Sequence, residues 1–347
     1  MTGGIVVVGC GSIGQRHLGN LRRLHAGPLL AVDPMAERRT RAKEEHGAEA
    51  FERPEEALAK RPVAALICTP PHLHLAGARQ AIEAGAHVFI EKPLSHTLEG
   101  VAELLEQARQ RERLVCVGYN LRFHAGLRRL KELLDAGAIG RPLALQAEFG
   151  QYLPDWRPAR DYRQGYNAHA AMGGSIILDA SHELDYVRWL AGEVDRVFCV
   201  AGHVSRLEMD TEDLAAITLQ MAQGVIAEVH LDCVQRGYSR RCKVIGEEGT
   251  LAWDLNAGVR WLAGQDKGWR EFPMVPDPND MYVEEMRHVL QCLRGECAPC
   301  VDGATGRRVL EIAVAACRSA ATGQPVSVEP RAEMAVNVSE GTADHGL

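Results

Sequence analysis

The stretch Ile5-Val6-Val7-Val8-Gly9-Cys10-Gly11-Ser12-Ile13-Gly14 joins a buried β-type run to a glycine-rich turn, and a helical pattern follows to about Leu24. In such a turn the first glycine permits a tight bend, the second lets the backbone approach a pyrophosphate, and the third allows the helix to pack closely on the strand. The N-terminus of the helix then faces the anion. The glycines could serve the turn alone, but their place between strand and helix predicts a dinucleotide-binding Rossmann unit.

The next apolar run, residues 29–32, ends in Asp33, which lies 19 residues beyond Gly14. An acidic side chain at this place accepts hydrogen bonds from both ribose hydroxyls of NAD and repels the additional phosphate of NADP. Arg38 and Arg39 are close enough in the chain to soften this preference. We therefore expect NAD as the cofactor and favour it over NADP.

Further buried strands are predicted over residues 64–68, 88–90 and 114–118, and helices end near residue 84 and cover 98–111. Strands that alternate with helices imply right-handed crossovers and a doubly wound parallel sheet. Thr69 follows the strand over 64–68 and offers a hydroxyl where the cofactor phosphates should pass. We assign residues 1–120 to a Rossmann domain.

The pattern changes after residue 120. Helices are expected over 126–136 and 177–191, a strand over 143–149, a long polar and aromatic loop over 150–167, and closing helices near 280–294 and 303–321. Between 194 and 262 apolar residues recur with a period of two, which predicts an antiparallel sheet with one buried face. Residues 121–328 form a second, substrate-binding and oligomerisation domain in this interpretation, and 329–347 a mobile tail. The polar side chains of the other sheet face suit either water or a subunit interface: Thr218, Gln220, Glu228, His230 and Asp232.

The composition of the 347-residue chain is that of a globular protein, with 46% hydrophobic residues, a net charge of −7 and a pI near 6.1. This charge argues against a nucleic-acid partner. No apolar run approaches the roughly 18 residues of a membrane span. Because a strand begins almost at once, without a signal-peptide pattern, we expect a cytoplasmic protein.

Ten cysteines are present, and most lie inside apolar patterns, where a free thiol behaves as a small hydrophobe. Cys292, Cys297 and Cys300 are the exception, since their spacing resembles that of a zinc or iron–sulfur site. A fourth ligand at suitable spacing is not evident. We therefore expect reduced thiols and no metal.

Lys92 occupies the carboxyl end of the predicted strand over 88–90, within Glu91-Lys92-Pro93. Ligands of open parallel sheets bind in the crevice outside these strand ends. A lysine held there can meet a substrate, and burial lowers its pKa towards useful proton transfer. The alternative is an ordinary solvated lysine.

A second candidate stretch runs from Gly173-Gly174 through Asp179 and His182. On one continuous helix Asp179, His182, Tyr186 and Trp189 would share a face. An acid one turn from a histidine can fix its tautomer and stabilise its protonated form, as a general base requires. The alternative is a pair whose members merely satisfy each other.

The 150–167 loop concentrates side chains suited to sugars and anions. Aromatic rings can stack on sugar faces, and arginines can bind a carboxylate or phosphate with two parallel hydrogen bonds. This composition favours an anionic sugar as substrate; the alternative is a loop that packs on a neighbouring subunit. The side chains are Tyr152, Trp156, Tyr162, Tyr166, Arg157, Arg160 and Arg163.

The glycine turn, Glu91-Lys92-Pro93, and the Gly-Gly…Asp…His helix ending in Trp189-Leu190 together resemble the glucose–fructose oxidoreductase / inositol dehydrogenase / MocA family over about residues 1–325. The resemblance implies a second α+β domain with a large, open, mostly antiparallel sheet. It also implies hydride exchange between a nicotinamide and a carbinol carbon of a sugar or polyol. Lys92, Asp179 and His182 match the catalytic residues of the family, and Glu91 matches its ribose-contacting acid.

One departure from the family concerns Asp179 and His182, which are three residues apart instead of the usual four, so Asp185 is a second candidate to support His182. Motifs near residues 118–124, 151–157 and 181–186 resemble a bacterial branch that acts on surface-polysaccharide sugars. This narrows the predicted substrate to an anionic or nucleotide-linked sugar. Which sugar, which carbon, the reaction direction and the oligomeric state stay open.

In the predicted mechanism His182 removes the hydroxyl proton and Lys92 stabilises the alkoxide or relays the proton. The alternatives are redox-assisted elimination or glycoside cleavage, and a regulator that senses NAD and a sugar without chemistry. We expect a homodimer or homotetramer formed through the open sheet face, and a cis peptide between Lys92 and Pro93. The expected cofactor contacts are Gly9, Gly11, Ser12, Ile13, Gly14, Asp33, Thr69, Pro70, His74, Glu91, Lys92 and Asn120. The expected substrate contacts are Lys92, Arg122, Tyr152, Trp156, Arg157, Arg163, Asp179 and His182.

Overall fold

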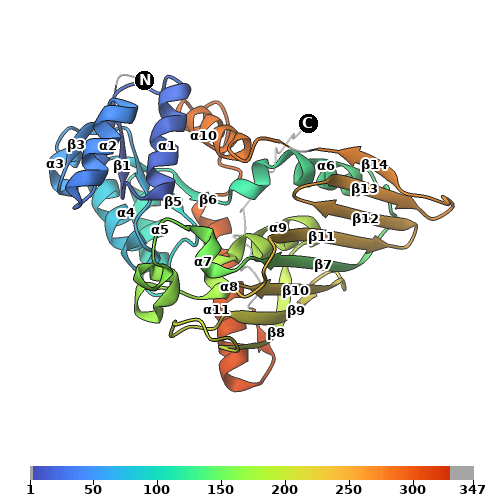
Figure 1. Cartoon of the computed structure of the whole chain (residues 1–347). Helices are drawn as coiled ribbons and strands as arrows, with labels where there is room; N and C mark the ends of the chain where they lie inside the picture. The colour runs from blue at the N-terminus through green and yellow to red at the C-terminus, as the bar shows by residue number, and fades with distance from the viewer. Residues whose placement is uncertain (1–2, 275, 329–347) are drawn as a thin grey trace, which may run out of the picture.

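A six-stranded parallel sheet with the order β3-β2-β1-β4-β5-β6 forms the first half of the chain, as the computed structural model of residues 3–274 and 276–328 shows (Figure 1). This is the predicted Rossmann arrangement. Its strands are β1 Ile5–Val8, β2 Leu29–Val32, β3 Glu49–Phe51, β4 Ala64–Ile67, β5 His87–Glu91 and β6 Val115–Gly118. Its helices are α1 Ser12–Arg23, α2 Ala36–His46, α3 Pro54–Leu58, α4 His74–Glu83 and α5 Val101–Gln110, with 3₁₀ turns η1 Pro71–Leu73 and η2 Asn120–Phe123.

The central strands β1, β2 and β4 are buried at every position, which explains their unbroken apolar sequences. A parallel sheet is covered by helices on both faces, so neither face needs polar side chains. The strand order reverses at β1, where β2 lies on one side and β4 on the other. The crevice outside the carboxyl ends of these strands is the usual ligand site of such sheets.

A nine-stranded sheet with the order β14-β13-β12-β11-β7-β10-β9-β8-β15 forms the second half. Among its described strands every pairing is antiparallel except that of β7 with β10. The sheet is mostly antiparallel, as the family resemblance implied. The alternation of apolar residues alone had predicted an antiparallel sheet, and for the pair β7 and β10 this prediction was wrong. Alternation reports which face is buried and does not report the direction of the neighbouring strand. The strands are β7 Pro142–Gly150, β8 Val194–Gly202, β9 Leu214–Met221, β10 Ile226–Asp232, β11 Ser239–Gly246, β12 Gly249–Asp254, β13 Gly258–Ala263, β14 Arg270–Pro273 and β15 Val326–Ser327.

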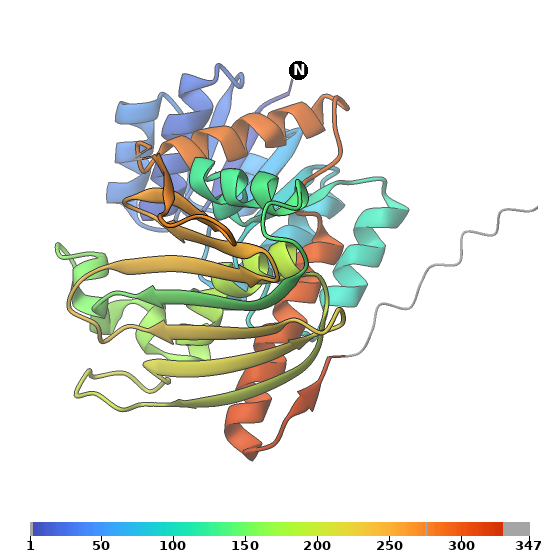
Figure 2. The same cartoon turned by 90° about the vertical axis from the view of Figure 1, so that its right-hand side faces the viewer.

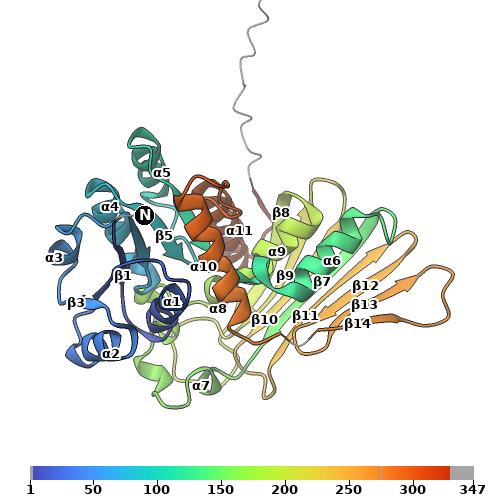
Figure 3. The same ribbon diagram turned by 90° about the horizontal axis from the view of Figure 1, so that it is seen from above.

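Helices cover one face of this second sheet, and Figures 2 and 3 show the other face without helices over most of its area. The covered face receives the buried alternate residues of β9, such as Ala215, Ile217 and Leu219. The intervening residues of the same strand are exposed. The covering helices are α6 Ala125–Asp135, α9 Ser181–Ala191 and α11 Gly303–Thr322, and the remaining short elements are α7 Leu153–Trp156, α8 Ile176–Asp179, η3 Tyr162–Gln164, η4 Tyr166–Ala168 and η5 Ala170–Met172.

Helix α10, Asp280–Leu293, packs on the first sheet although it follows strands β7 to β14 of the second one in the chain (Figure 3). Its Met286, Val289 and Leu290 share an apolar core with residues of β1 and α1. The amides of Asn20 and Asn279 join α1 to the start of α10 with hydrogen bonds of 2.8 and 3.3 Å. The chain therefore returns to the Rossmann half, and the two halves are not strictly consecutive.

No helix in the described part of the chain is long and apolar enough to cross a membrane. The predicted mobile tail, residues 329–347, lies outside the described residues.

Candidate active site

The glycine turn between β1 and α1 has the backbone shape that a dinucleotide requires. Gly9 has a φ of +93°, in the region that favours glycine. A Cβ on Gly14 would lie 2.0 Å from the carbonyl oxygen of Gly9, so this helix could not pack so closely with any side chain there. A Cβ on Gly11 would meet no atom within 4 Å, because this position faces open space. The three glycines therefore fit the cradle of a cofactor pyrophosphate.

Asp33, at the end of β2, is buried and joined to this turn. Its Oδ2 accepts a hydrogen bond of 2.9 Å from the backbone N–H of Cys10, and its Oδ1 accepts one of 2.9 Å from Met35. Arg38 lies 3.2 Å from the same carboxylate and compensates part of its charge. Asp33 thus stands where a ribose would bind and also holds the glycine turn against β2.

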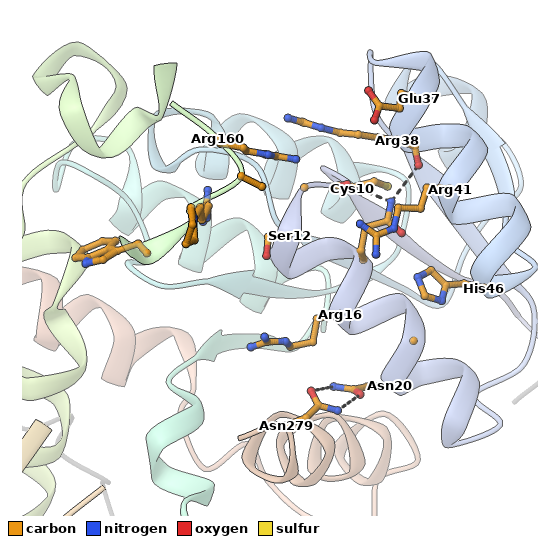
Figure 4. Close-up of a pocket in the computed structure, with 17 residues that line it drawn as sticks. Cys10, Ser12, Arg16, Asn20, Glu37, Arg38, Arg41, His46, Arg160 and Asn279 are labelled. Carbon is orange, nitrogen blue, oxygen red and sulfur yellow. Dashed lines mark hydrogen bonds between the residues drawn. The ribbon is translucent and has the colours of Figure 1, made fainter. Parts of the chain in front are cut away.

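A cavity of about 640 Å³ opens beside the turn, and Figure 4 shows arginines around Ser12. Trp156 and Arg157, which were predicted to contact the substrate, line this cavity together with Gly11 and Ser12. The cavity is bounded by both halves of the chain and is rich in positive charge, as a bound pyrophosphate requires. Its arginines are Arg16, Arg38, Arg41, Arg157 and Arg160.

Lys92 lies at the end of β5 and reaches into the second half of the chain. Its Nζ donates a 2.6 Å hydrogen bond to the backbone carbonyl of Asp179. Burial lowers the pKa of the Lys92 ammonium, while the neighbouring carboxylates of Asp179 and Glu91 act in the opposite direction. The expected cis peptide between Lys92 and Pro93 is confirmed.

The predicted helix over 177–191 is broken, because α8 ends at Asp179 and α9 begins at Ser181. Ala180 between them has φ −96° and ψ 26°, outside helical values. The carbonyl of Asp179 accepts from Lys92, and the N–H of Glu183 donates to Ala180 instead. The prediction that Asp179 and His182 share the face of one continuous helix was therefore wrong, although both lie near Lys92.

His182 is buried beside Lys92, with its ring edge-on to that of Tyr119 at a centroid distance of 5.6 Å. Within the described residues its Nδ1 has no hydrogen-bond partner. Burial, followed by the charges of Lys92 and Arg240, holds the pKa of His182 well below its ordinary value. The imidazole is therefore neutral near pH 7 and has one buried ring nitrogen without a partner in the described residues.

Of the two carboxylates considered as support for His182, Asp185 is committed elsewhere. Its two oxygens accept hydrogen bonds of 2.7 and 2.9 Å from the buried guanidinium of Arg122. The carboxylate of Asp179 accepts a hydrogen bond of 2.7 Å from Asn167 and is also a hydrogen-bond partner of Tyr166, while its Oδ1 has no close partner among the described residues. Burial raises the pKa of Asp179. Asp179 is the carboxylate that retains a free oxygen at the site.

The remaining predicted cofactor contacts fall into two groups. The Oγ1 of Thr69 is buried and has no partner in the described chain, so its hydrogen-bonding capacity is unused. His74, in contrast, is buried and both its ring nitrogens lie 2.8 Å from carbonyl oxygens, those of Thr69 and Pro93. His74 therefore fixes the two loops rather than offering a group to the cofactor. Glu91 accepts a 2.6 Å hydrogen bond from His17 of α1, and Asn120 is buried in η2.

The remaining predicted substrate contacts are mostly occupied by protein partners. Arg163 is exposed and pairs with Asp161 and Glu208. The guanidinium of Arg236 covers the ring of Tyr152 at 3.6 Å from its centroid. Arg122 is likewise paired, with Asp185, so the charges of Arg122 and Arg163 are balanced within the protein, and their contact with a substrate stays a prediction.

Several residues of the site were not predicted from the sequence. Tyr119, Asn167 and the buried pair of Arg240 with Glu183, whose nearest atoms are 2.9 Å apart, surround Lys92, Asp179 and His182. Asn167 belongs to the loop whose aromatic and basic residues were considered, but one amide carries no sequence signal. Arg240 looked like an ordinary strand residue, and only the pairing of β11 with β7 places it here.

Glu285 of α10 is a buried acid with no hydrogen-bond partner for either carboxylate oxygen in the described residues. Burial, and then the nearby charge of Glu91, raise its pKa well above the ordinary value for a glutamate. In the folded protein Glu285 therefore keeps its proton to a higher pH than in the unfolded chain. Its protonated form avoids a second buried negative charge behind Glu91.

The protonation of Glu285 gives a stability prediction. In the range between the unfolded and folded pKa values the folded state binds the additional proton, so stability falls as the pH rises. Glu285→Gln should remove this dependence. The stability of the variant relative to the wild type should therefore be greater at about pH 9 than at about pH 5. Denaturant unfolding at several pH values measures it. Glu284→Gln, at a partly exposed position of the same helix, is the control, and equal pH dependence of both variants and the wild type would contradict the assignment.

The fold and site define the class of the protein. A Rossmann sheet with a dinucleotide cradle is joined to a second half with a mixed sheet. The second half places a histidine beside the lysine at the end of β5. This is the architecture of a nicotinamide-dependent oxidoreductase. Residues 4–119 match the model of the oxidoreductase family with an NAD-binding Rossmann fold, and residues 127–252 match the GFO/IDH/MocA C-terminal domain. The chain belongs to this family, and NAD is its cofactor.

Three known proteins illustrate the relationship. An inositol 2-dehydrogenase of Burkholderia lata is 33% identical over 288 residues, which cover 78% of this chain and 81% of that one. The crystal structure of GenD2 from gentamicin A biosynthesis in complex with NAD is 26% identical, with a TM-score of 0.82, covering 95% of this chain and 97% of that one. The WlbA dehydrogenase of Bordetella pertussis, crystallised with NADH and UDP-GlcNAcA, is 24% identical, with a TM-score of 0.81 and coverage of 95% and 100%. At this identity the last comparison shows the fold alone.

Asp33 gives a prediction about the cofactor. The wild type should bind NADH more tightly than NADPH, and Asp33→Ala should narrow the difference, because the carboxylate that repels a 2′-phosphate is lost. Arg38→Ala should increase the difference between the affinities for NADH and NADPH, since Arg38 offsets the charge of Asp33. Titration of nicotinamide fluorescence with NADH and NADPH measures the six affinities of the wild type and the two variants. Equal affinity of the wild type for both cofactors would contradict the prediction.

Proposed function

We propose that the enzyme oxidises a CH–OH group of a sugar or polyol and reduces NAD. The observation that carries this proposal is the hydrogen bond from Lys92 to the backbone of Asp179, which brings the lysine beside the neutral, unpartnered imidazole of His182. Both groups lie at the carboxyl edge of the Rossmann sheet, where the nicotinamide would bind. A proton acceptor and a hydrogen-bond donor beside a hydride acceptor are the groups that alcohol oxidation needs.

The roles of the side chains follow from their charges. Bound NAD supplies the acceptor for the hydride of the carbinol carbon. His182 is neutral, so its open nitrogen can receive the hydroxyl proton of the substrate. The ammonium of Lys92 donates a hydrogen bond to the same oxygen and stabilises its developing negative charge. The free Oδ1 of Asp179 stabilises positive charge at this place as the proton is transferred.

The narrower substrate we propose is an anionic or nucleotide-linked sugar of bacterial surface-polysaccharide metabolism, recognised through Arg157. Among the arginines predicted to contact the substrate, Arg122 and Arg163 are balanced by carboxylates, which leaves Arg157. The charge of Arg157 acts on the carboxyl of Asp179, so it lies within electrostatic reach of the reacting groups. The inositol 2-dehydrogenase relative represents the competing class, a neutral cyclic polyol.

A substrate screen tests both levels of the proposal. NADH absorbance is followed with inositols, free aldoses, sugar acids and nucleotide-linked sugars. We expect the highest kcat/KM with an anionic sugar and a selective loss in Arg157→Gln, with the KM for NAD changing little. Fastest turnover of a neutral polyol would reject the narrower substrate, and a rise in the KM for NAD alone would assign Arg157 to the cofactor. No NADH formation with any alcohol would reject the function itself.

Two alternative functions use the same groups. In redox-assisted elimination or glycoside cleavage the hydride returns to the product, so NAD would act in catalytic amounts and no NADH would accumulate. A regulator would bind NADH without turnover. Accumulation of NADH in equal amount with a keto product would exclude both. Lys92, Asp179 and His182 together favour chemistry over sensing.

We further propose that the chain forms a homodimer or homotetramer through the helix-free face of the nine-stranded sheet. Phe198, Val200 and Ile226 on this face are 40%, 62% and 55% exposed. Apolar side chains of this size on an uncovered sheet favour a partner of the same kind. Light scattering should give a dimer or tetramer, and Val200→Glu should lower the mass to that of one chain. A wild-type monomer at micromolar concentration would reject it.

A further inference from the structure

The end of α10 and the loop that follows it gather a histidine and two thiols. The Sγ of Cys292 lies 3.5 Å from the Nε2 of His288 and 3.5 Å from the Sγ of Cys297. The Sγ of Cys297 lies 3.6 Å from the Nδ1 of His288. One ligand atom from each residue can be chosen so that all three lie within 4.8 Å of one another. Cys292 and Cys297 were expected to be ordinary thiols, because no further ligand was apparent in the sequence.

The local structure explains how this cluster forms. His288 and Cys292 are four residues apart on α10 and therefore share one face of the helix. Gly295, with a φ of +74°, reverses the chain just after the helix and directs Cys297 back to that face. The turn is closed by hydrogen bonds from Gly295 to the carbonyl of Cys292 and from Glu296 to that of Gln291, at 2.9 and 3.0 Å. The histidine that completes the cluster precedes the cysteines in the sequence, and the spacing of the cysteines alone did not indicate it.

From this geometry we propose that His288, Cys292 and Cys297 bind one zinc ion. Sulfur and nitrogen ligands of a tetrahedral zinc are about 3.4–3.8 Å apart, given bond lengths of about 2.3 and 2.1 Å. The observed separations of 3.5 and 3.5 Å around Cys292 agree with two edges of such a tetrahedron. Two thiolates and one imidazole suit zinc rather than magnesium or calcium. Cys297 is exposed, so water can enter the fourth position.

The proton balance of the site is defined. Zinc binds Cys292 and Cys297 as thiolates, so each ion taken up releases two protons. Because protons compete with zinc for the thiolates, affinity should increase with pH. The Nε2 of His288 now accepts a 2.9 Å hydrogen bond from the backbone N–H of Cys300. When zinc binds, it takes the Nε2 lone pair in place of the N–H of Cys300. That exposed amide then forms a hydrogen bond with water.

The position of the cluster indicates a structural role for the zinc rather than a catalytic one. The ring of His288 lies 5.4 Å from that of Phe123 in η2, where the chain leaves the Rossmann half. The loop beyond Cys300 reaches Asp302, which bridges to Cys116 of β6 and caps α11. Zinc would tie the end of α10 to the segment that enters α11, at the junction of the two halves. It should therefore raise the melting temperature and leave the pH profile of turnover unchanged.

Metal binding is tested on the full-length protein, reduced and freed of metal with a chelator. We expect uptake of one zinc per chain in competition with a chromophoric chelator, with release of two protons. Cobalt(II) should give the absorption of tetrahedral thiolate coordination. Cys297→Ser, at an exposed position that should not disturb folding, and His288→Gln should each weaken binding more than about 100-fold.

Cys317→Ser, on α11, is the matched control and should bind as the wild type does. Absence of stoichiometric zinc uptake, or unchanged affinity in Cys297→Ser, would overturn the proposal. A Cys292–Cys297 disulfide in the isolated protein, together with no uptake after its reduction, would also overturn it and identify a thiol pair instead.

Discussion

Lys92→Met should lower kcat by about 10² or more while the affinity for NADH changes little. Methionine keeps much of the length of the side chain but cannot donate a hydrogen bond or carry the charge that stabilises the alkoxide. The cradle formed by Gly9, Gly11 and Gly14 lies outside the change, so cofactor binding should persist. Steady-state rates beside nicotinamide fluorescence titrations separate the two effects.

The control for this substitution is Lys60→Met, which removes a surface lysine of the same half that pairs with Glu49. It should retain wild-type turnover. Lys92→Met also leaves the carbonyl of Asp179 without its donor, so its melting temperature must be recorded with the rate. Wild-type kcat in Lys92→Met would refute the role given to Lys92, and loss of NADH binding would make it a structural residue.

Asp185→Ala should destabilise the protein by about 3–5 kcal/mol, the usual loss when one partner of a buried ion pair is removed. Arg122 is 8% exposed and Asp185 1%, and their two hydrogen bonds join η2 to α9. Without the carboxylate the guanidinium stays buried without its counter-charge, because its other close contact is the ring of Trp189. Denaturant unfolding at pH 7 measures the loss.

The double variant Arg122→Met/Asp185→Leu separates the pair from the cavity that alanine leaves. Apolar side chains of similar volume should restore most of the stability, because no isolated charge remains. Equal destabilisation of the single and double variants would show that packing, rather than charge, governs this contact. If Asp185→Ala instead lost turnover without losing stability, Asp185 would be the support of His182 after all.

The Rossmann half was predictable because its constraints are local. A glycine needed for a positive φ, an acid at the end of the second strand and uninterrupted apolar strands all act within about 30 residues of one another. The same reasoning placed Lys92 correctly, since the end of a parallel strand is a fixed place in the fold. What the residue touches there depends on the second half of the chain, and no local pattern carries that information.

The break at Ala180 shows why the rest was not predictable. Helical spacing assumes that each backbone carbonyl is available to the next turn, whereas a lysine 87 residues away takes the carbonyl of Asp179. Likewise, the arginines of the 150–167 loop were counted as free charges, and nearby acids neutralise Arg163. Composition reveals which charges a segment contains but not which of them are already paired.

The return of α10 to the first sheet has a consequence for how the protein is made. The apolar surface of α1 and β1 that receives Met286, Val289 and Leu290 is synthesised before the second sheet. Its cover, α10, is synthesised more than 250 residues later, after strands β7 to β14. The nascent Rossmann half must therefore wait with an uncovered apolar patch, the kind of surface that chaperones bind. The core of the cofactor half is therefore completed only when α10 has been synthesised.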